Sequence, residues 1–243
     1  MKKAVILVSG GMDSALTAAI ACKKYHPAFL HINYGQRTQK RELKAFNDIA
    51  DYYNVKDRFV ADISYLKKIG GSSLTDKNIR VSDATILNEA AFSYLSGKNL
   101  KLKNKNIPSS YVPFRNANIL AIAVSWAEVI KAEKIFIGAV EEDSSGYPDC
   151  RKVFFKDYNR MIKSGTKNDF NIEIETPVIH LSKKEIILKS IALKSPLHLT
   201  WSCYKRNDIA CGVCDSCALR LRGFGQAGKI DPIKYKKIIN FSL

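Results

Sequence analysis

Apolar and polar positions follow two alternating periods along the first sixty residues. Residues 2–9 contain the continuous apolar run AVILV, which is typical of a strand buried on both faces of a parallel sheet. A helix with an apolar face is predicted at 14–24. Strands at 28–33 and 58–62 flank a charged helix at 39–53. This alternation predicts an α/β fold with a doubly wound parallel sheet.

The pattern breaks at 64–110, which we interpret as an irregular insertion that partly covers the site. It holds the run Gly-Gly-Ser-Ser at 70–73 and a predicted helix at 84–95. The pattern then resumes with helices at 117–131 and 151–164, a strand at 134–140, an extended piece at 172–179, a helix opened by a Ser-Lys-Lys-Glu capping box at 182–185, and a basic helix at 218–227. We expect a catalytic domain at 1–195 and a small C-terminal metal-bound region at 196–243.

Composition adds few constraints. The chain of 243 residues is 46% hydrophobic and 26% charged, and no apolar run reaches the roughly 18 residues of a membrane span. A glycine-rich loop rather than a cleavage site follows the first apolar run, so we expect a cytoplasmic protein with no membrane partner. The net charge of +16 favours anionic partners. The lysine patch at 98–105 lacks aromatic residues, so we expect a solvated loop there and no stable nucleic-acid complex.

The loop Ser9-Gly10-Gly11-Met12-Asp13-Ser14 lies between a predicted buried strand and a helix. Glycines let the backbone approach an anion, and the helix start offers unpaired N–H groups, so this context predicts a phosphate site. Asp13 suits such a site only if Mg²⁺ or a loop N–H offsets its charge. The alternative is a tight turn with Asp13 as the N-cap. The loop matches neither the Walker A pattern nor G-x-G-x-x-G.

Four cysteines, Cys203, Cys211, Cys214 and Cys217, form the pattern C-x7-C-x2-C-x2-C. Four thiolates at this spacing predict a closed tetrahedral zinc site that stabilises the chain end. An iron–sulfur cluster is the alternative, although Cys217 is followed by Ala218 and not by the proline of bacterial ferredoxins.

Loops after parallel strands build the ligand crevice of such folds, and several chemically suitable side chains fall there. Arg115, Arg151 and Lys183 are suited to hold a carboxylate or phosphate. The same loops carry aromatic rings for stacking on a flat base, an acceptor for a guanine-type edge and other polar side chains. The full candidate substrate-binding set is Gln36, Tyr111, Phe114, Arg115, Asn116, Tyr147, Asp149 and Arg151. Each has an ordinary alternative, such as a turn at Tyr147 or a surface position for Lys183. For Cys150 we expect a buried, inert thiol.

The loop SGGMDS resembles that of the PP-loop ATP pyrophosphatases, which are adenine nucleotide alpha hydrolase-like enzymes. This resemblance implies an ATP site at Val8, Ser9, Gly10, Gly11, Met12, Asp13, Ser14 and Ala15, together with His31 and Asn33 on the next strand. The candidate catalytic residues are Asp13, Ser14, Arg115 and Lys183.

The segments 34–37, 111–116, 144–151, 176–183, 200–204 and 214–224, taken in order, resemble the 7-cyano-7-deazaguanine synthase family of queuosine biosynthesis. One departure is Phe114, where that family's pattern Y-V-P-G-R-N leads us to expect glycine. The resemblance implies that ATP adenylates 7-carboxy-7-deazaguanine and that ammonia and dehydration yield the nitrile. It also implies Mg²⁺, one structural zinc ion per chain and a homodimer. The chain length leaves no room for a glutaminase domain, so we expect free ammonia as the donor.

Two other functions stay open from the sequence. A tRNA-thiolating PP-loop enzyme would suit the positive charge, and it would show salt-dependent binding to tRNA. A non-catalytic nucleic-acid-binding zinc module would suit the cysteines but would leave the glycine loop and the α/β pattern unexplained.

Overall fold

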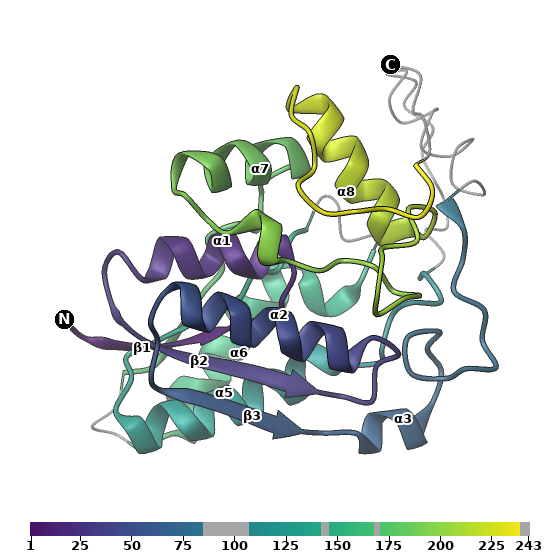
Figure 1. The fold of residues 1–243 in the computed structure, drawn as a ribbon. Coiled ribbons are helices and arrows are strands. Elements are labelled where there is room, and N and C mark those ends of the chain that lie inside the picture. Colours follow the sequence, from purple (N-terminus) through teal and green to yellow (C-terminus); the bar gives the residue numbers. More distant parts are fainter. Residues whose placement is uncertain (85–106, 142–145, 168–170, 239–243) are drawn as a thin grey trace.

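A five-stranded parallel sheet forms the centre of the molecule (Figure 1). The computed structural model describes residues 1–84, 107–141, 146–167 and 171–238. The strand order is β3-β2-β1-β4-β5, and every neighbouring pair is parallel. The strands are β1 (Lys3–Leu7), β2 (His26–Asn33), β3 (Arg58–Asp62), β4 (Lys134–Phe136) and β5 (Glu173–Glu175). The predicted α/β class is confirmed.

Helices cover both faces of this sheet, as the uninterrupted apolar run of β1 requires. Val5 and Leu7 face α5 (Arg115–Ile130) and α6 (Lys152–Gly165). Ala4, Ile6 and Val8 face α1 (Met12–Ala21) and α2 (Gln39–Tyr52). Since successive side chains of a strand point to opposite faces, one short strand contributes to two cores.

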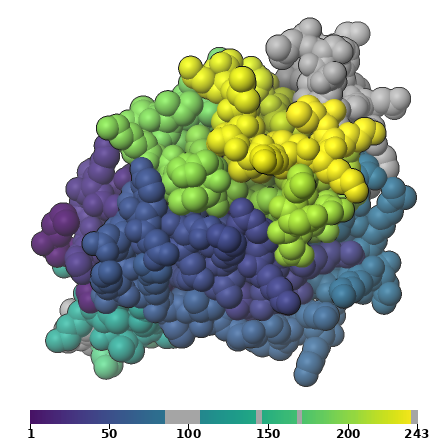
Figure 2. Space-filling model, viewed as in Figure 1, coloured from purple at the N-terminus to yellow at the C-terminus, as the bar shows by residue number. Residues whose placement is uncertain are grey.

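A further layer is formed by α7 (Lys183–Ala192) and α8 (Asp215–Gln226), which pack together beside α1. Their shared core includes Leu16 of α1, Ile187 of α7 and Phe224 of α8. In Figure 2 the green and yellow C-terminal segments lie directly against the purple and blue N-terminal ones. The division at residue 195 stays a prediction.

Several predicted boundaries shift. The helix after the glycine loop begins at Met12, two residues early, and the strand predicted at 134–140 ends at Phe136. Within the predicted insertion, α3 (Tyr65–Ile69) is a short helix, and the 3-10 turns η2 (Pro148–Cys150) and η3 (Leu197–Leu199) lie in later loops. The patch at 98–105 and all but the first residue of the helix predicted at 84–95 lie outside the described residues.

Candidate active site

A cavity of about 290 Å³ opens where the carboxyl ends of β1, β2 and β4 meet. Its lining comes from the glycine loop, the first turns of α1, α5 and α7, the chain at 137–140, and the segment 201–204. Parallel α/β sheets bind ligands at this edge. Segments far apart in sequence therefore supply one site.

The glycine loop forms the floor of this cavity. Gly10 has φ +91°, and a Cβ there would lie 2.8 Å from the Glu42 carbonyl oxygen, so only glycine fits the close packing on α2. The N-cap of α1 is Gly11, which has no side chain to cap the helix start. The first N–H groups of α1 are left for a ligand or water, with the positive end of the helix dipole behind them. Asp13 is within the first turn and is not the N-cap.

A charged pair lies beside this helix start. Lys183 is the first residue of α7, and its Nζ lies 2.8 Å from Asp13 Oδ2. The capping box at Ser182 and Glu185 holds this helix end, as the sequence predicts. The other carboxylate oxygen, Asp13 Oδ1, is buried and has no hydrogen-bond partner among the described residues. Both charges line the cavity.

Gly138 brings the chain after β4 against this pair. A Cβ at Gly138 would lie 2.8 Å from the Asp13 carbonyl carbon and 2.8 Å from the Ser14 nitrogen. No flexible side-chain end could move aside there, because these are backbone atoms of α1. A glycine is therefore required for the chain to close this side of the cavity.

Aromatic groups and a second cation form another part of the cavity wall. Arg115 Nη1 donates to the Tyr34 hydroxyl at 3.2 Å, and its guanidinium lies 5.0 Å from that ring centre. Tyr147 and Tyr204 complete the wall. Burial disfavours the charged form of Arg115, but electrostatic interactions with the groups around it, Tyr34 foremost, raise the pKa of its guanidinium overall. Burial disfavours the phenolate form of Tyr34 and Tyr204 and therefore raises the pKa of both hydroxyls.

Asp149 supports this wall from behind. It accepts a hydrogen bond from the Asn116 backbone nitrogen at 2.9 Å, and the Asn116 side chain donates to the Asp149 carbonyl oxygen and to Cys150 Sγ. Burial raises the pKa of Asp149, while the Asn116 bond and the Arg115 charge oppose that rise. Asp149 therefore orients the first turn of α5, which carries Arg115.

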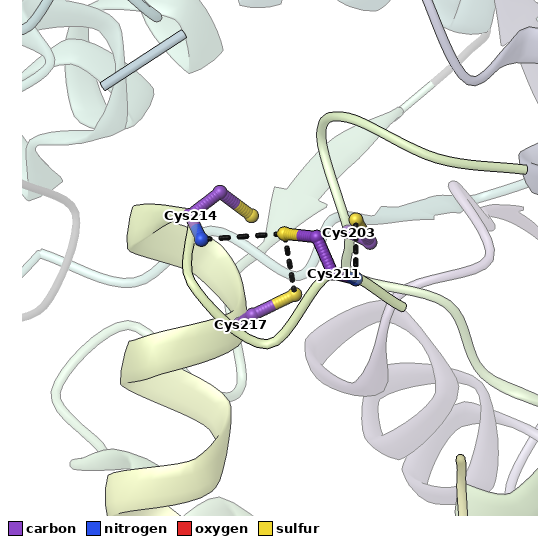
Figure 3. A group of neighbouring side chains, drawn as sticks. All are labelled: Cys203, Cys211, Cys214 and Cys217. Carbon is purple, nitrogen blue, oxygen red and sulfur yellow. Dashed lines mark hydrogen bonds between the residues drawn. The ribbon is translucent and has the colours of Figure 1, made fainter. Parts of the chain in front are cut away.

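The four clustered cysteines converge in space (Figure 3). Their Sγ atoms all lie within 4.8 Å of one another, and all four residues are buried. Four thiolates about 2.3 Å from one ion would lie ~3.8 Å apart, so the cluster fits a metal ion after a small contraction. Backbone N–H groups of Cys211 and Cys214 point at sulfur atoms, at 3.3 Å each. The predicted metal cluster is confirmed as a site that can bind a metal.

Comparison with known proteins shows the family of this chain. The family model described as queuosine biosynthesis protein QueC matches residues 3–228. The 7-cyano-7-deazaguanine synthase of Chloroherpeton thalassium is 57% identical over 235 residues, which cover 96% of this chain and 97% of that protein. The protein of the same name from Chlorobium chlorochromatii is 54% identical, with 96% of each chain covered.

The chain belongs to the QueC family. This confirms the resemblance noted in the sequence and shows that the chain is an enzyme of that family. Among solved structures, a predicted subunit of tRNA methyltransferase from Methanocaldococcus jannaschii aligns with a TM-score of 0.43 and 19% identity over 78% of this chain and 75% of that one.

The candidate residues of this QueC-family chain divide into two groups. Those that line the cavity are Val8, Ser9, Gly11, Met12, Asp13, Ser14, Arg115, Asn116, Tyr147 and Lys183. Those that lie outside its lining are Gly10, Ala15, His31, Asn33, Gln36, Tyr111, Phe114, Asp149 and Arg151. Phe114 is 61% exposed and Arg151 is also exposed, whereas His31 is buried and bonded to the Val8 carbonyl oxygen at 2.9 Å. The individual roles stay predictions.

Sequence reasoning missed several lining residues. Tyr34 follows β2 in a loop and Glu42 lies in α2, at positions that look ordinary in the sequence, and Trp201, Ser202 and Tyr204 belong to a segment noted only for its family resemblance. For Tyr34 and the three residues of 201–204, the signal was their position in the 34–37 and 200–204 segments, which already pointed to the QueC family. Cys150 is buried, as expected, and it also lines the cavity.

The described helices include none that is both long and apolar enough to cross a membrane.

Proposed function

We propose that this chain is a 7-cyano-7-deazaguanine synthase that converts 7-carboxy-7-deazaguanine, ammonia and ATP to the nitrile through adenylated intermediates. The supporting observation is one cavity that is lined by two chemically different groups of side chains. The uncapped start of α1 beside Lys183 suits a polyphosphate, and the wall of Arg115 and tyrosines suits a flat, acidic heterocycle.

The proposed chemistry balances in two activations. A carboxylate oxygen attacks the α-phosphorus of ATP and pyrophosphate leaves. Ammonia attacks the acyl carbon, AMP leaves with that oxygen, and a proton is released, which gives the amide. The amide oxygen then attacks a second ATP, pyrophosphate leaves again, and loss of AMP and of both amide N–H protons gives the nitrile. Each carboxylate oxygen therefore ends in one AMP.

The residues of the chain would act mainly by binding and orientation. The N–H groups of the first turn of α1 and the Lys183 ammonium would stabilise negative charge on the departing pyrophosphate. Asp13 Oδ1, which is buried and has no partner in the described part of the chain, fits one oxygen ligand of Mg²⁺, which when bound would neutralise phosphate charge. Arg115 would hold the carboxylate near the α-phosphorus, and the Tyr34, Tyr147 and Tyr204 side chains would keep water from the adenylate.

The four-cysteine cluster is proposed to hold one structural zinc ion. All four sulfurs are protein ligands, so no position is left for water or substrate. Denaturing the protein and measuring released metal should give one zinc per chain and no iron or acid-labile sulfide. Release of one iron per chain, with no zinc, would contradict zinc as the bound metal.

We also propose that the substrates are small molecules, that the protein is cytoplasmic and homodimeric, and that nucleic acid is not a stable partner. The net charge of +16 is then an adaptation to anionic substrates and solubility.

An isotope experiment tests the reaction. The enzyme is incubated with ATP, ammonium and substrate carrying ¹⁸O in both carboxylate oxygens, and the products are analysed by mass spectrometry. We expect the unlabelled nitrile and two AMP molecules, each heavier by one ¹⁸O. If ¹⁸O appeared in inorganic phosphate and ADP were the product, the proposed adenylated intermediate would be wrong. If no nitrile formed, the proposed substrate would be wrong. Sulfur incorporation into tRNA would instead support the thiolating alternative.

A further inference from the structure

Arg220 of α8 has an unusually complete set of partners. Its side chain is fully buried, and it forms a two-point ion pair with Asp231 at 2.7 and 2.9 Å. The other three N–H groups reach Thr200 Oγ1 at 2.7 Å, Ser202 Oγ at 3.3 Å and the Leu197 carbonyl oxygen at 3.2 Å. All five guanidinium donors therefore have acceptors, and those acceptors come from two separate segments.

One of these segments is the C-terminal stretch 229–238, which we call the strap. Asp231 also accepts from the Tyr235 hydroxyl at 2.6 Å. The strap then runs along the metal lobe, where the Lys236 nitrogen donates to the Ala210 carbonyl oxygen at 2.8 Å. A Cβ at Gly212 would overlap the Lys237 carbonyl oxygen, so the strap lies directly over the cysteine loop. The family match ends at residue 228, before the strap.

The other segment, 197–202, leads to the glycine loop. The Trp201 backbone nitrogen, between the two side chains bonded to Arg220, donates to the Gly10 carbonyl oxygen at 2.8 Å. Trp201 lines the cavity, and the Arg41 guanidinium lies 4.6 Å from the centre of its ring. One hydrogen-bonded path therefore joins Asp231 through Arg220, Thr200 and Trp201 to Gly10.

We propose that Arg220 is a positioning residue: held by Asp231 of the strap, it fixes the 200–202 segment and so sets the place of Trp201 and of the glycine loop for ATP. Arg220 itself does not line the cavity, so it acts through other residues. The inference rests on the proposed function because it takes the glycine loop as the ATP site.

The hydrogen-bonded path can be interrupted by a substitution that removes no charged group. Thr200→Val deletes the hydroxyl that accepts from Arg220 and donates to Leu197, while the ion pair with Asp231 stays. Thr166→Val is the matched control, because the Thr166 hydroxyl also donates to a carbonyl oxygen, that of Ile162 at 2.8 Å, at the end of α6. Both substitutions are made in a Trp126→Phe background. The chain has two tryptophans, so Trp201 alone then reports by fluorescence.

Two readouts are combined with thermal melting on the full chain. In Thr200→Val we expect acrylamide quenching of Trp201 to increase about twofold and the Kd for ATP to rise about five- to tenfold, the size of one ordinary hydrogen bond. Thr166→Val should change neither quantity, and thermal melting shows how much stability each variant has lost.

The outcomes separate the inference from the proposed function. Failure of the Trp126→Phe parent to bind ATP would overturn the proposed function. Normal ATP binding by that parent, with Trp201 quenching and ATP affinity unchanged in Thr200→Val, would overturn the positioning role alone. A loss of ATP affinity that is equal in both valine variants would also overturn it, because general destabilisation would then be the cause.

Discussion

Two cation–carboxylate pairs in this protein have opposite surroundings. Lys183 and Asp13 meet through one contact of 2.8 Å, their side chains are 12% and 29% exposed, and Asp13 Oδ1 has no hydrogen-bond partner among the described residues. Arg220 and Asp231 are 0% and 4% exposed, and all five Arg220 donors have acceptors. We call them the open pair and the closed pair.

The difference shows what each pair does. An unmet buried carboxylate oxygen costs free energy, so the open pair is consistent with a site that is completed by a ligand. The closed pair has no capacity left for a ligand, and its removal would leave an uncompensated buried charge. The open pair is therefore expected to control activity, and the closed pair to control the fold around the site.

The largest expected effect is on the closed pair. Asp231→Ala leaves the Arg220 guanidinium buried without its counter-charge, and the free energy of unfolding should fall by about 3–5 kcal/mol in urea denaturation. The matched control is Asp208→Ala, because Asp208 pairs with Arg206 at the surface, where side chains are 36% and 60% exposed. That control should leave stability close to wild type. Equal losses in the two variants would contradict the distinction between closed and exposed pairs.

Removing the cation of the open pair should lower activity and leave stability nearly unchanged. Lys183→Met removes the ammonium beside the start of α1, and kcat/KM for ATP should fall about 10²- to 10³-fold in steady-state kinetics, as for loss of one transition-state donor. The free energy of unfolding should change little. Its neighbour Lys184 is exposed, so Lys184→Met controls for loss of charge at the same helix end. Retained activity in Lys183→Met would exclude the ammonium from catalysis.

A substitution with a smaller expected effect tests how closely the chain after β4 must pack against the open pair. Gly138→Ala places a Cβ 2.8 Å from backbone atoms of Asp13 and Ser14, so stability should fall by about 1–3 kcal/mol and ATP affinity should fall with it. Gly165→Ala is the control, because nothing lies within 4 Å of its Cβ position, and at a helix end alanine should be neutral or stabilising by up to ~1 kcal/mol. A neutral Gly138→Ala would mean that the two segments can move apart.

The residues of the open pair could be named from the sequence, whereas those of the closed pair could not. Asp13 lies in a loop with a local signature, and Lys183 follows a capping serine, so each was found from its own neighbours in the sequence. Their contact spans 170 positions and was not predicted. Asp231 and Thr200 reach Arg220 from 11 and 20 positions away. No local period encodes such contacts, because they arise only when tertiary packing brings the segments together.

Phe114 shows that a sequence pattern can indicate the backbone conformation of a residue without giving the direction of its side chain. The family pattern led to an expectation of glycine at this position, and the residue has φ +55°, a left-handed conformation that glycine adopts without strain. The stacking role proposed for its ring depended on the direction of the side chain, which the pattern does not give. The ring lies against Phe154, with centres 6.3 Å apart, and outside the cavity.

The smallest expected effect concerns how Lys183 is held. Ser182→Ala removes the hydroxyl that accepts from the Glu185 nitrogen at the start of α7, which should cost about 1 kcal/mol of stability by urea denaturation. Because Lys183 is the next residue, a loosened helix start should raise KM for ATP about two- to fivefold and leave the closed pair intact. Ser125→Ala, on the exposed side of α5, removes a hydroxyl bonded only within its own helix and should do neither. If Ser182→Ala lowered stability by this amount with KM for ATP unchanged, the contact with Asp13 would hold the Lys183 ammonium in place without help from the cap.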